Sequence, residues 1–196
     1  METKTSLEDK IKRFVPTVLT ADSSGLTMGD RQALGKIIAA AKYLDPLYRQ
    51  QIWSGSEALL KKLEADKTVA VQQRLHYFRL NQGPWSRLDE NQAFIEDVPA
   101  RMPQAGFYPE DITKEEFNAW SSGLSAAEKE RATGYFFVIR RDSAGGLQSV
   151  SYSEEYREFL EPAAKLLREA AQLTTNDTLK DFLTRRAAAF ASRRFT

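Results

Sequence analysis

The sequence predicts an α+β fold that is predominantly helical, with one β-hairpin near residues 135–152. Most of the chain carries apolar residues three or four positions apart, which is the spacing of one helix face. Residues 135–141 are instead aromatic and β-branched, and a turn-forming stretch separates them from a return strand at 147–152. Hydrophobic residues make up 42% of the 196 residues and charged residues 28%, which is ordinary globular composition.

The chain begins with two segments that we do not expect to be helical. Residues 1–12 are polar and charged, so we expect a flexible N-terminus there. Residues 14–19 contain Pro16 and β-branched residues, which favours an extended segment. We assign the remaining residues, 13–196, to a single helical α+β domain.

The first predicted helix begins after Thr27, a residue type suited to the N-cap. We expect Asp45-Pro46 to break or kink this helix, because the residue before proline avoids helical geometry. Its predicted apolar face consists of Leu34, Ile37, Ile38, Ala41 and Leu44.

Three shorter helices are predicted before residue 81. They span residues 47–53, 57–65 and 67–80, and Ser56 is the expected cap of the second. The third should turn Val71, Leu75 and Phe78 inward.

Residues 81–106 predict a long irregular segment, since they contain several Gly, Pro, Asn and Asp residues. Loops of this length are usually functional or disordered. Trp85, Phe94 and Ile95 favour an ordered loop that packs on the body of the protein.

The second half of the chain predicts four helices around the hairpin. Thr113 and Ser125 each begin a capping box and should open short helices. Ser153 is expected to cap a long helix, with Pro162 kinking it or shifting its start. Asn176 or Asp177 can cap the last helix, whose predicted apolar face consists of Leu179, Phe182, Leu183 and Phe190.

Charge and hydropathy exclude several classes of partner. The net charge is +1, so we expect no nucleic-acid partner. The N-terminus lacks the apolar core of a signal peptide, and no apolar stretch is long enough to span a bilayer. We therefore expect no membrane partner and a cytoplasmic protein.

No residue pattern specifies a reaction. His76 is the one histidine and cysteine is absent, so the chain cannot by itself hold a complete histidine- or cysteine-ligated zinc site. We expect His76 to be a partly buried packing residue on its helix. Serine-nucleophile and phosphate-loop motifs are missing, as is the Arg-Glu-x-x-Glu-Glu pattern of Nudix hydrolases. We predict no catalytic and no metal-binding residue.

Five segments resemble the N-terminal region of bacterial proteins in the dipeptidyl peptidase III-like family of zinc metallopeptidases. Asn81-Gln82-Gly83-Pro84-Trp85-Ser86-Arg87-Leu88-Asp89 and Phe107-Tyr108-Pro109 belong to the most specific of them. The resemblance covers about residues 11–192, and its segments are Arg13–Asp22, Asp45–Gln51, Asn81–Asn91, Gly106–Phe117 and Tyr152–Tyr156.

The resemblance implies part of a two-lobed exopeptidase that removes dipeptides from short peptides. It implies zinc for the full-length family protein, held by a histidine- and glutamate-bearing helix that this chain does not contain. We therefore expect no cofactor in this chain and no activity of the chain alone. The expected partners are the missing C-terminal catalytic region of the same protein and short peptides.

One wall of a peptide-binding cleft is the role that the resemblance suggests for this lobe. We predict that the substrate-binding residues lie in the loop that follows residue 80, because it combines hydrogen-bonding, charged and flat apolar groups. The alternative is that Arg87 and Asp89 pin this loop to its own domain through backbone hydrogen bonds. The predicted substrate-binding residues are Asn81, Trp85, Arg87, Asp89, Phe107 and Tyr108.

Two other functions stay open at this point. A stand-alone peptide- or protein-binding module without catalytic activity would expose the hydrophobic surface that the other lobe would cover. An independent hydrolase built on carboxylates would need calcium or magnesium, yet no Asp-x-Asp-x-Asp-Gly loop is present.

Overall fold

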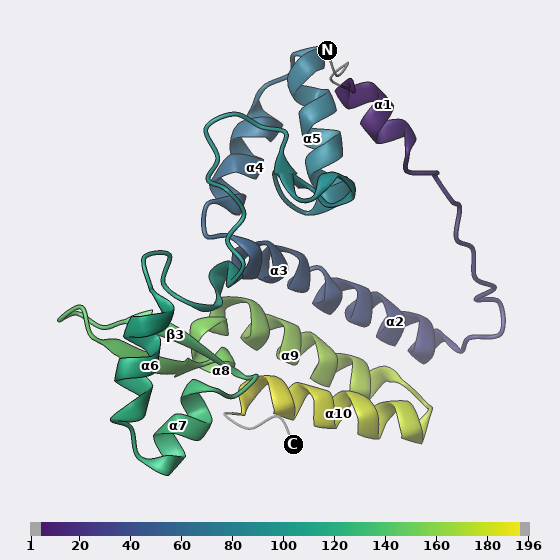
Figure 1. Cartoon of the computed structure of the whole chain (residues 1–196). Helices are drawn as coiled ribbons and strands as arrows, with labels where there is room; N and C mark the ends of the chain where they lie inside the picture. Colours follow the sequence, from purple (N-terminus) through teal and green to yellow (C-terminus); the bar gives the residue numbers. More distant parts are fainter. Residues whose placement is uncertain (1–4, 193–196) are drawn as a thin grey trace. The chain divides into compact units, whose positions relative to one another are not determined.

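The structure is a computed structural model that describes residues 5–192 (Figure 1). Helices dominate and two small antiparallel hairpins accompany them, which confirms the predicted α+β class. The chain divides into two compact units. The first unit contains the residues up to Ala21 and Arg49–Ala105, and the second contains Asp22–Tyr48 and the residues from Gly106 onward. This division does not establish how many domains fold independently, so the single domain over 13–196 stays a prediction.

The first unit is built around a short hydrophobic core between two antiparallel helices. Leu63, Leu75 and Phe78 are buried there, and Phe94 and Ile95 of the following loop pack against them. The predicted inward face of the 67–80 helix and the predicted packing of the loop are therefore confirmed. The elements of this unit are α1 (Leu7–Lys12), the end of α3 (Leu44–Ile52), α4 (Ser56–Ala65), α5 (Val69–Asn81), β1 (Trp85–Ser86) and β2 (Gln92–Ala93).

The described part of the segment expected to be flexible forms the helix α1. The side chain of Ser6 caps this helix by accepting a hydrogen bond from the backbone N–H of Asp9, at 3.1 Å. Four of its six residues carry charges that suit the helix dipole or pair along the helix. Flexibility of residues 1–12 stays a prediction.

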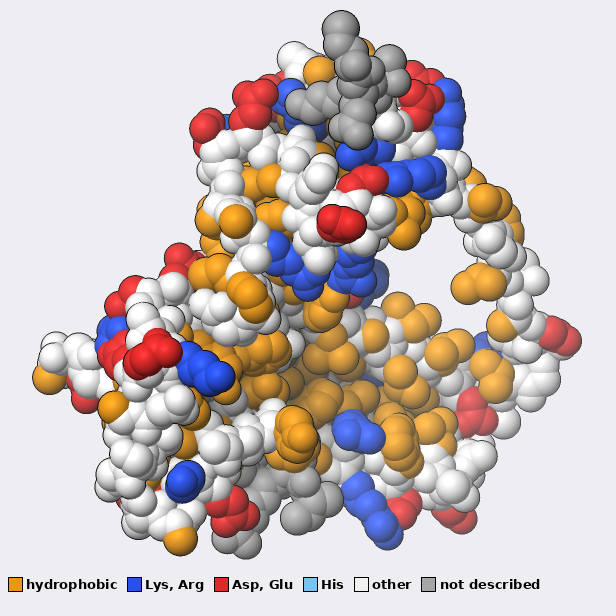
Figure 2. All heavy atoms as spheres, viewed as in Figure 1, with side chains coloured by type: hydrophobic (Ala, Val, Ile, Leu, Met, Phe, Trp, Pro, Cys, Tyr) orange, Lys and Arg blue, Asp and Glu red, His pale blue; other side chains and the backbone are white. Residues whose placement is uncertain are grey.

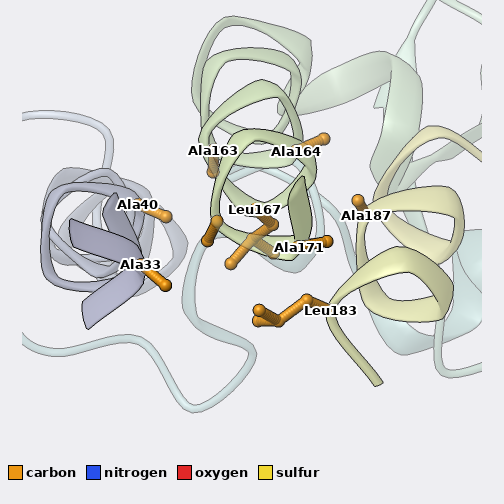
Figure 3. Close-up of a cluster of buried hydrophobic side chains, with 9 residues drawn as sticks. Ala33, Ala40, Ala163, Ala164, Leu167, Ala171, Leu183 and Ala187 are labelled. Atoms are coloured by element: carbon orange, nitrogen blue, oxygen red, sulfur yellow. The ribbon is translucent and has the colours of Figure 1, made fainter. Parts of the chain in front are cut away.

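The second unit rests on three helices that pack through alanine. Its helices are α2 (Met28–Ala41), the start of α3, α6 (Lys114–Ser122), α7 (Ala126–Ala132), α8 (Tyr152–Glu155), α9 (Arg157–Leu173) and α10 (Asp177–Ala191). Figure 3 shows α9 between α2, which contributes Ala33 and Ala40, and α10, which contributes Leu183 and Ala187. Small side chains at these contacts let the helix backbones approach closely.

This alanine packing corrects the predicted apolar face of α2. Ala33 and Ala40 are the buried residues, and Ile37 is partly buried. Leu34, Ile38 and Leu44 are instead 41%, 51% and 39% exposed. The prediction favours large apolar residues, whereas the buried residues of α2 that contact α9 are alanines.

Two further helix boundaries differ from the predicted ones. Asp45-Pro46 does not break a helix, because Pro46 lies in the first turn of α3, where its missing N–H leaves no hydrogen bond unmade. Ser153 does not cap the long helix. It lies inside α8, and α9 begins at Arg157 and continues through Pro162.

The remaining caps follow the predicted chemistry. Ser125 and Glu128 form a reciprocal capping box, and Asn176 caps α10 by accepting from the N–H of Leu179 at 2.9 Å. Thr113 accepts from the N–H of Glu116, but the carboxylate of Glu116 binds Arg141 at 2.9 and 3.0 Å. Glu116 thus ties α6 to the hairpin.

The predicted hairpin is present and a second one was not foreseen. Strands β3 (Phe137–Arg141) and β4 (Leu147–Ser151) pair antiparallel, with Ile139 opposite Ser149. The unforeseen pair is β1 with β2, which joins Trp85 to Ala93 and Ser86 to Gln92. Two-residue strands carry no periodic pattern, so sequence alone gives no signal for them.

The predicted apolar face of the last helix, α10, is wrong at one residue. Leu183 is 2% exposed, but Phe182 is 53% exposed and lies beneath the guanidinium of Arg186, 5.5 Å from its ring centroid. No helix among residues 5–192 combines the length and the apolar character needed to cross a bilayer.

Asp30 ties the start of α2 to the turn between α9 and α10. Its carboxylate accepts from the hydroxyl of Thr174 at 2.6 Å, from Thr27 at 2.7 Å and from the N–H of Thr175 at 3.1 Å. The hydroxyl of Thr174, first among these donors, lowers the pKa of Asp30 from 3.8 to about 2.

We expect Asp30→Asn to remove one acid-sensitive contribution to stability. A lowered folded-state pKa stabilises the fold above the unfolded value of 3.8, and this stabilisation is lost as the pH falls toward 2. The wild-type chain should therefore lose more stability than Asp30→Asn across this window, as urea unfolding monitored by circular dichroism would measure. Equal losses in both proteins would contradict the assignment.

Candidate functional site

The loop after α5 is held in an unusual backbone conformation. Gln82 adopts the left-handed region at φ 55° and ends α5, while the N–H of Gly83 donates to the carbonyl of Phe78. Four more non-glycine residues of the described chain have positive φ, and all lie in the same stretch: Glu90, Asn91, Asp97 and Ala105. Such conformations cost free energy and persist where surrounding contacts enforce them. The loop is thus ordered by its packing.

Asn81 and Trp85 provide much of that packing. Asn81 is 3% exposed, donates to the carbonyl of Tyr77 at 2.9 Å and accepts from the N–H of Arg87 at 3.1 Å. Trp85 is 4% exposed, and its indole N–H donates to the carbonyl of Pro99 at 3.0 Å. Both side chains direct their polar atoms to the backbone of their own unit.

Asp89 is the centre of an ionic cluster that joins the loop to α1. The guanidinium of Arg13 binds both carboxylate oxygens, at 2.8 and 2.7 Å, and the ammonium of Lys10 lies 2.9 Å from one of them. The hydroxyl of Ser86 also donates to this carboxylate, at 2.5 Å. Arg13 above all, then Ser86 and Lys10, hold the pKa of Asp89 well below its usual range.

The same cluster extends to the buried phenol of Tyr77. Its oxygen lies 3.0 Å from Arg13 and 2.7 Å from the hydroxyl of Ser86. Lys10, Arg13, Tyr77 and Ser86 were absent from the predicted site. Their charges and hydroxyl groups are common at protein surfaces, so nothing in their spacing signals that they meet around Asp89.

Arg87 is the most exposed of the predicted residues in the first unit. Its backbone N–H is fixed by Asn81, and its side chain is exposed beside Leu88, which is 57% exposed. Asn81 holds the loop through a hydrogen bond to the backbone of Arg87, and Asp89 holds it through ion pairs rather than through the backbone hydrogen bonds of the alternative. Arg87 combines a fixed backbone with an exposed side chain.

Phe107 and Tyr108 belong to the second unit. Phe107 stacks on Tyr152 with ring centroids 6.2 Å apart, and Tyr108 meets the ring of Phe117 edge-on at 5.7 Å. Both rings are partly buried. The six predicted residues thus divide between the units, and their shared role in binding substrate stays a prediction.

Two hollows in the first unit differ greatly in size. The one lined by Asn81, Trp85 and Arg87 has a volume of about 10 Å³, which leaves no space for a ligand side chain. The one lined by α1, Asp89 and residues 92–96 has a volume of about 770 Å³. The hollow beside Asp89 is therefore the roomier of these two.

A separate hollow of about 660 Å³ lies in the second unit, along the start of α9. Arg157, Lys165 and Arg168 line it together with Glu154 and Glu161, and all five side chains are exposed. Opposite charges are mixed there, so the hollow has no strong preference for one sign of ligand.

The residues present do not fit a zinc site. Within residues 5–192, no group of three or more histidine, cysteine, aspartate or glutamate side chains is placed where it could hold a metal ion. His76 is exposed on α5, which corrects the expectation of a partly buried packing residue. Leu75 and Tyr77 on either side of it turn inward, so the helix turns His76 toward solvent.

Comparison with known proteins places this fold among peptidases. No family model matches the chain. The structure of dipeptidyl-peptidase III from Corallococcus sp. strain EGB is similar over 96% of the chain, with a TM-score of 0.93 and 46% identity. The structure of DPP III from Caldithrix abyssi is similar over 96%, with a TM-score of 0.90 and 34% identity. The chain spans 35% of each.

A relative with a different name is also similar in sequence to nearly the whole chain. Nudix hydrolase 3 of Arabidopsis thaliana is 32% identical over 239 residues, which cover 97% of this chain and 31% of that protein. The Arg-Glu-x-x-Glu-Glu pattern is absent here, so the match gives no support for Nudix chemistry in this chain. The identity of 46% and the backbone agreement over nearly all residues decide the assignment. The chain is a dipeptidyl peptidase III-like region, consistent with the N-terminal part predicted from its sequence, and spans about a third of the proteins it matches.

Proposed function

We propose that the chain is a non-catalytic N-terminal lobe of a zinc-dependent dipeptidyl peptidase III-like enzyme. The observation that carries the proposal is the agreement with about a third of two dipeptidyl peptidase III structures. The lack of a metal-binding group among residues 5–192 supports a catalytic centre outside this lobe. The zinc belongs to the longer protein, and this chain supplies no ligand to it.

The lobe contributes one wall of the peptide-binding cleft, through the loop around Arg87. This wall is pre-organised, because Asn81 holds the backbone of Arg87 and the Asp89 cluster anchors the loop two residues further on. A rigid loop loses little entropy when a peptide binds. The guanidinium of Arg87 suits a peptide carbonyl or carboxylate, since it offers several donors in one plane.

Two proteins test this proposal: the isolated chain, and a chimera in which the chain replaces the matching third of the Corallococcus enzyme. We expect the isolated chain to hydrolyse no dipeptidyl substrate, with or without zinc. In the chimera, Arg87→Ala should raise KM roughly tenfold and leave kcat nearly unchanged, because a wall contact binds the ground state and the transition state alike.

Arg79→Ala is the matched control, since Arg79 is an exposed arginine of the first unit that pairs with Glu64 at 2.8 Å. Its KM should stay at the parental value. Identical kinetics of both variants would remove Arg87 from the cleft wall. Chelator-sensitive turnover by the isolated chain would replace the proposal with an independent hydrolase.

A stand-alone binding module is the second candidate, and exposed apolar side chains favour it. Leu34 and Ile38 on α2 and Val15 and Val18 before it are exposed, and such surfaces promote association. Peptide binding by the isolated chain, measured by titration calorimetry, would support this function. If the isolated chain binds no peptide, only the first proposal remains, in which the chain is a lobe of a longer enzyme.

A further inference from the structure

One side of α2 exposes apolar side chains at helical spacing. The α2 stripe consists of Leu34, Ile38 and Ala41 on α2 together with Leu44, the first residue of α3. Leu34 is 41% exposed, Ile38 51% and Leu44 39%. Figure 2 shows hydrophobic side chains gathered along this part of the second unit.

The spacing distinguishes this stripe from scattered surface leucines. Single exposed apolar residues are normal in soluble proteins, but residues at i, i+4 and i+7 form a continuous face of the kind that packs against another element. A different side of α2 already makes a contact, since Ala33 and Ala40 pack on α9. The helix therefore has a second apolar face, which no described residue of the second unit buries.

We infer that the α2 stripe is an interface for the part of the dipeptidyl peptidase III-like fold that this chain does not contain. The inference rests on the proposed function in one respect, that the lobe belongs to a longer protein. In the two solved structures the same fold covers 35% of the chain, so about two thirds of each chain is further polypeptide. That polypeptide is the partner of the stripe.

The size of the stripe favours a tethered partner over a second copy of this chain. Four partly exposed side chains present on the order of 300 Å², whereas each partner of a stable complex buries roughly 800 Å². A partner in the same polypeptide needs less area, because the covalent link raises its effective concentration to roughly millimolar levels. The area thus suits a contact made within one longer chain.

A second stretch of exposed apolar residues accords with this partner. Val15, Val18 and Leu19, between α1 and α2, are 82%, 87% and 91% exposed. Burying three such side chains would stabilise a longer fold, because apolar surface would leave water.

Thiol labelling tests the stripe directly, because the natural chain contains no cysteine. Ile38→Cys places a probe in the stripe. Gln32→Cys is the matched control, since Gln32 is exposed on the same helix, six residues away and on a different side. Each variant is made in the isolated chain and in the chimera with the Corallococcus enzyme, and maleimide labelling of the α2 peptide is followed by mass spectrometry.

We expect both thiols to react at similar rates in the isolated chain. In the chimera, Ile38→Cys should react at least about tenfold more slowly, because covering polypeptide must open before the reagent enters. Gln32→Cys should keep its rate.

Three results would overturn the inference. Equal labelling of the two thiols in the chimera would leave the stripe uncovered, and equal slowing of both would mean that the covered surface is not this face. Slow labelling of Ile38→Cys already in the isolated chain, with a dimeric mass by light scattering, would assign the stripe to a second copy.

This test separates the interface from the peptide site. Protection of Ile38→Cys with unchanged KM for Arg87→Ala would retain the interface and reject the cleft wall. Unprotected Ile38→Cys with a raised KM for Arg87→Ala would reject the interface and retain the cleft wall.

Discussion

Gly29→Ala is expected to destabilise the second unit by about 3 kcal/mol, because this position has no space for a side chain. A Cβ atom at Gly29 would lie 2.3 Å from the carbonyl oxygen of Leu173, at the end of α9. That oxygen is backbone, so relief requires moving α2 away from α9. The Asp30 bonds to Thr174 and Thr175 would be strained by the same movement. Urea unfolding monitored by circular dichroism measures the loss.

Gly35→Ala is the control for this prediction, since Gly35 lies in the same helix and a Cβ there meets nothing within 4 Å. Alanine in place of glycine inside a helix should stabilise it by roughly 0.5–1 kcal/mol. The two substitutions therefore have opposite expected signs. If both stabilise the protein, the close approach of α2 to the end of α9 is wrong.

Asp89→Ala is expected to destabilise the first unit by about 2 kcal/mol, because it leaves Arg13, Lys10 and Ser86 without their common acceptor. The carboxylate of Asp89 is 21% exposed, which is why the expected loss is smaller than for a fully buried pair. With the anchor gone, α1 should detach from the loop. Backbone hydrogen exchange of residues 7–12 and 84–93 would report this detachment.

The dependence of the free energy of unfolding on pH, at acid pH, gives an independent measurement for Asp89. Its pKa is held below the ordinary aspartate value of 3.8, so its stabilising contribution is complete above that pH and is lost as the pH falls through the folded value. The difference between the wild-type chain and Asp89→Ala should be full at neutral pH and shrink below pH 3.8.

Glu64→Ala is the matched control, because the pair of Glu64 with Arg79 is 44% and 60% exposed. Such a surface pair contributes at most about 1 kcal/mol. An Asp89→Ala loss no larger than that of Glu64→Ala would contradict the anchoring role.

Local sequence features predicted the elements that depend on neighbouring residues. The cap at Thr27, the box at Ser125 and the turn between β3 and β4 each bring together residues within five positions, and all are present. The inward face of α5 was correct because Leu75 and Phe78 are large and no small residue competes for the same contact. On α2 the buried residues are alanines, so the size of a residue did not predict whether it is buried.

The loop after α5 likewise has one feature that local sequence predicts and one that it does not. Its order was predictable from Trp85, Phe94 and Ile95, since large apolar side chains leave water. The Asp89 cluster was not, because Arg13 lies 76 positions away in the sequence. His76 was placed wrongly for a related reason: the turn of α5 on which it lies depends on the packing of Leu75 and Tyr77.

The sequence by itself determined the fold class, the dipeptidyl peptidase III-like resemblance and the exclusion of a self-contained histidine or cysteine zinc site. These depend on residue types and local order, which a sequence states directly. Only the tertiary structure decided which side of α2 packs, what holds Asp89 and which apolar stripe is left uncovered. Those outcomes depend on contacts between residues far apart in the chain, whose energies are set by fit rather than by residue type.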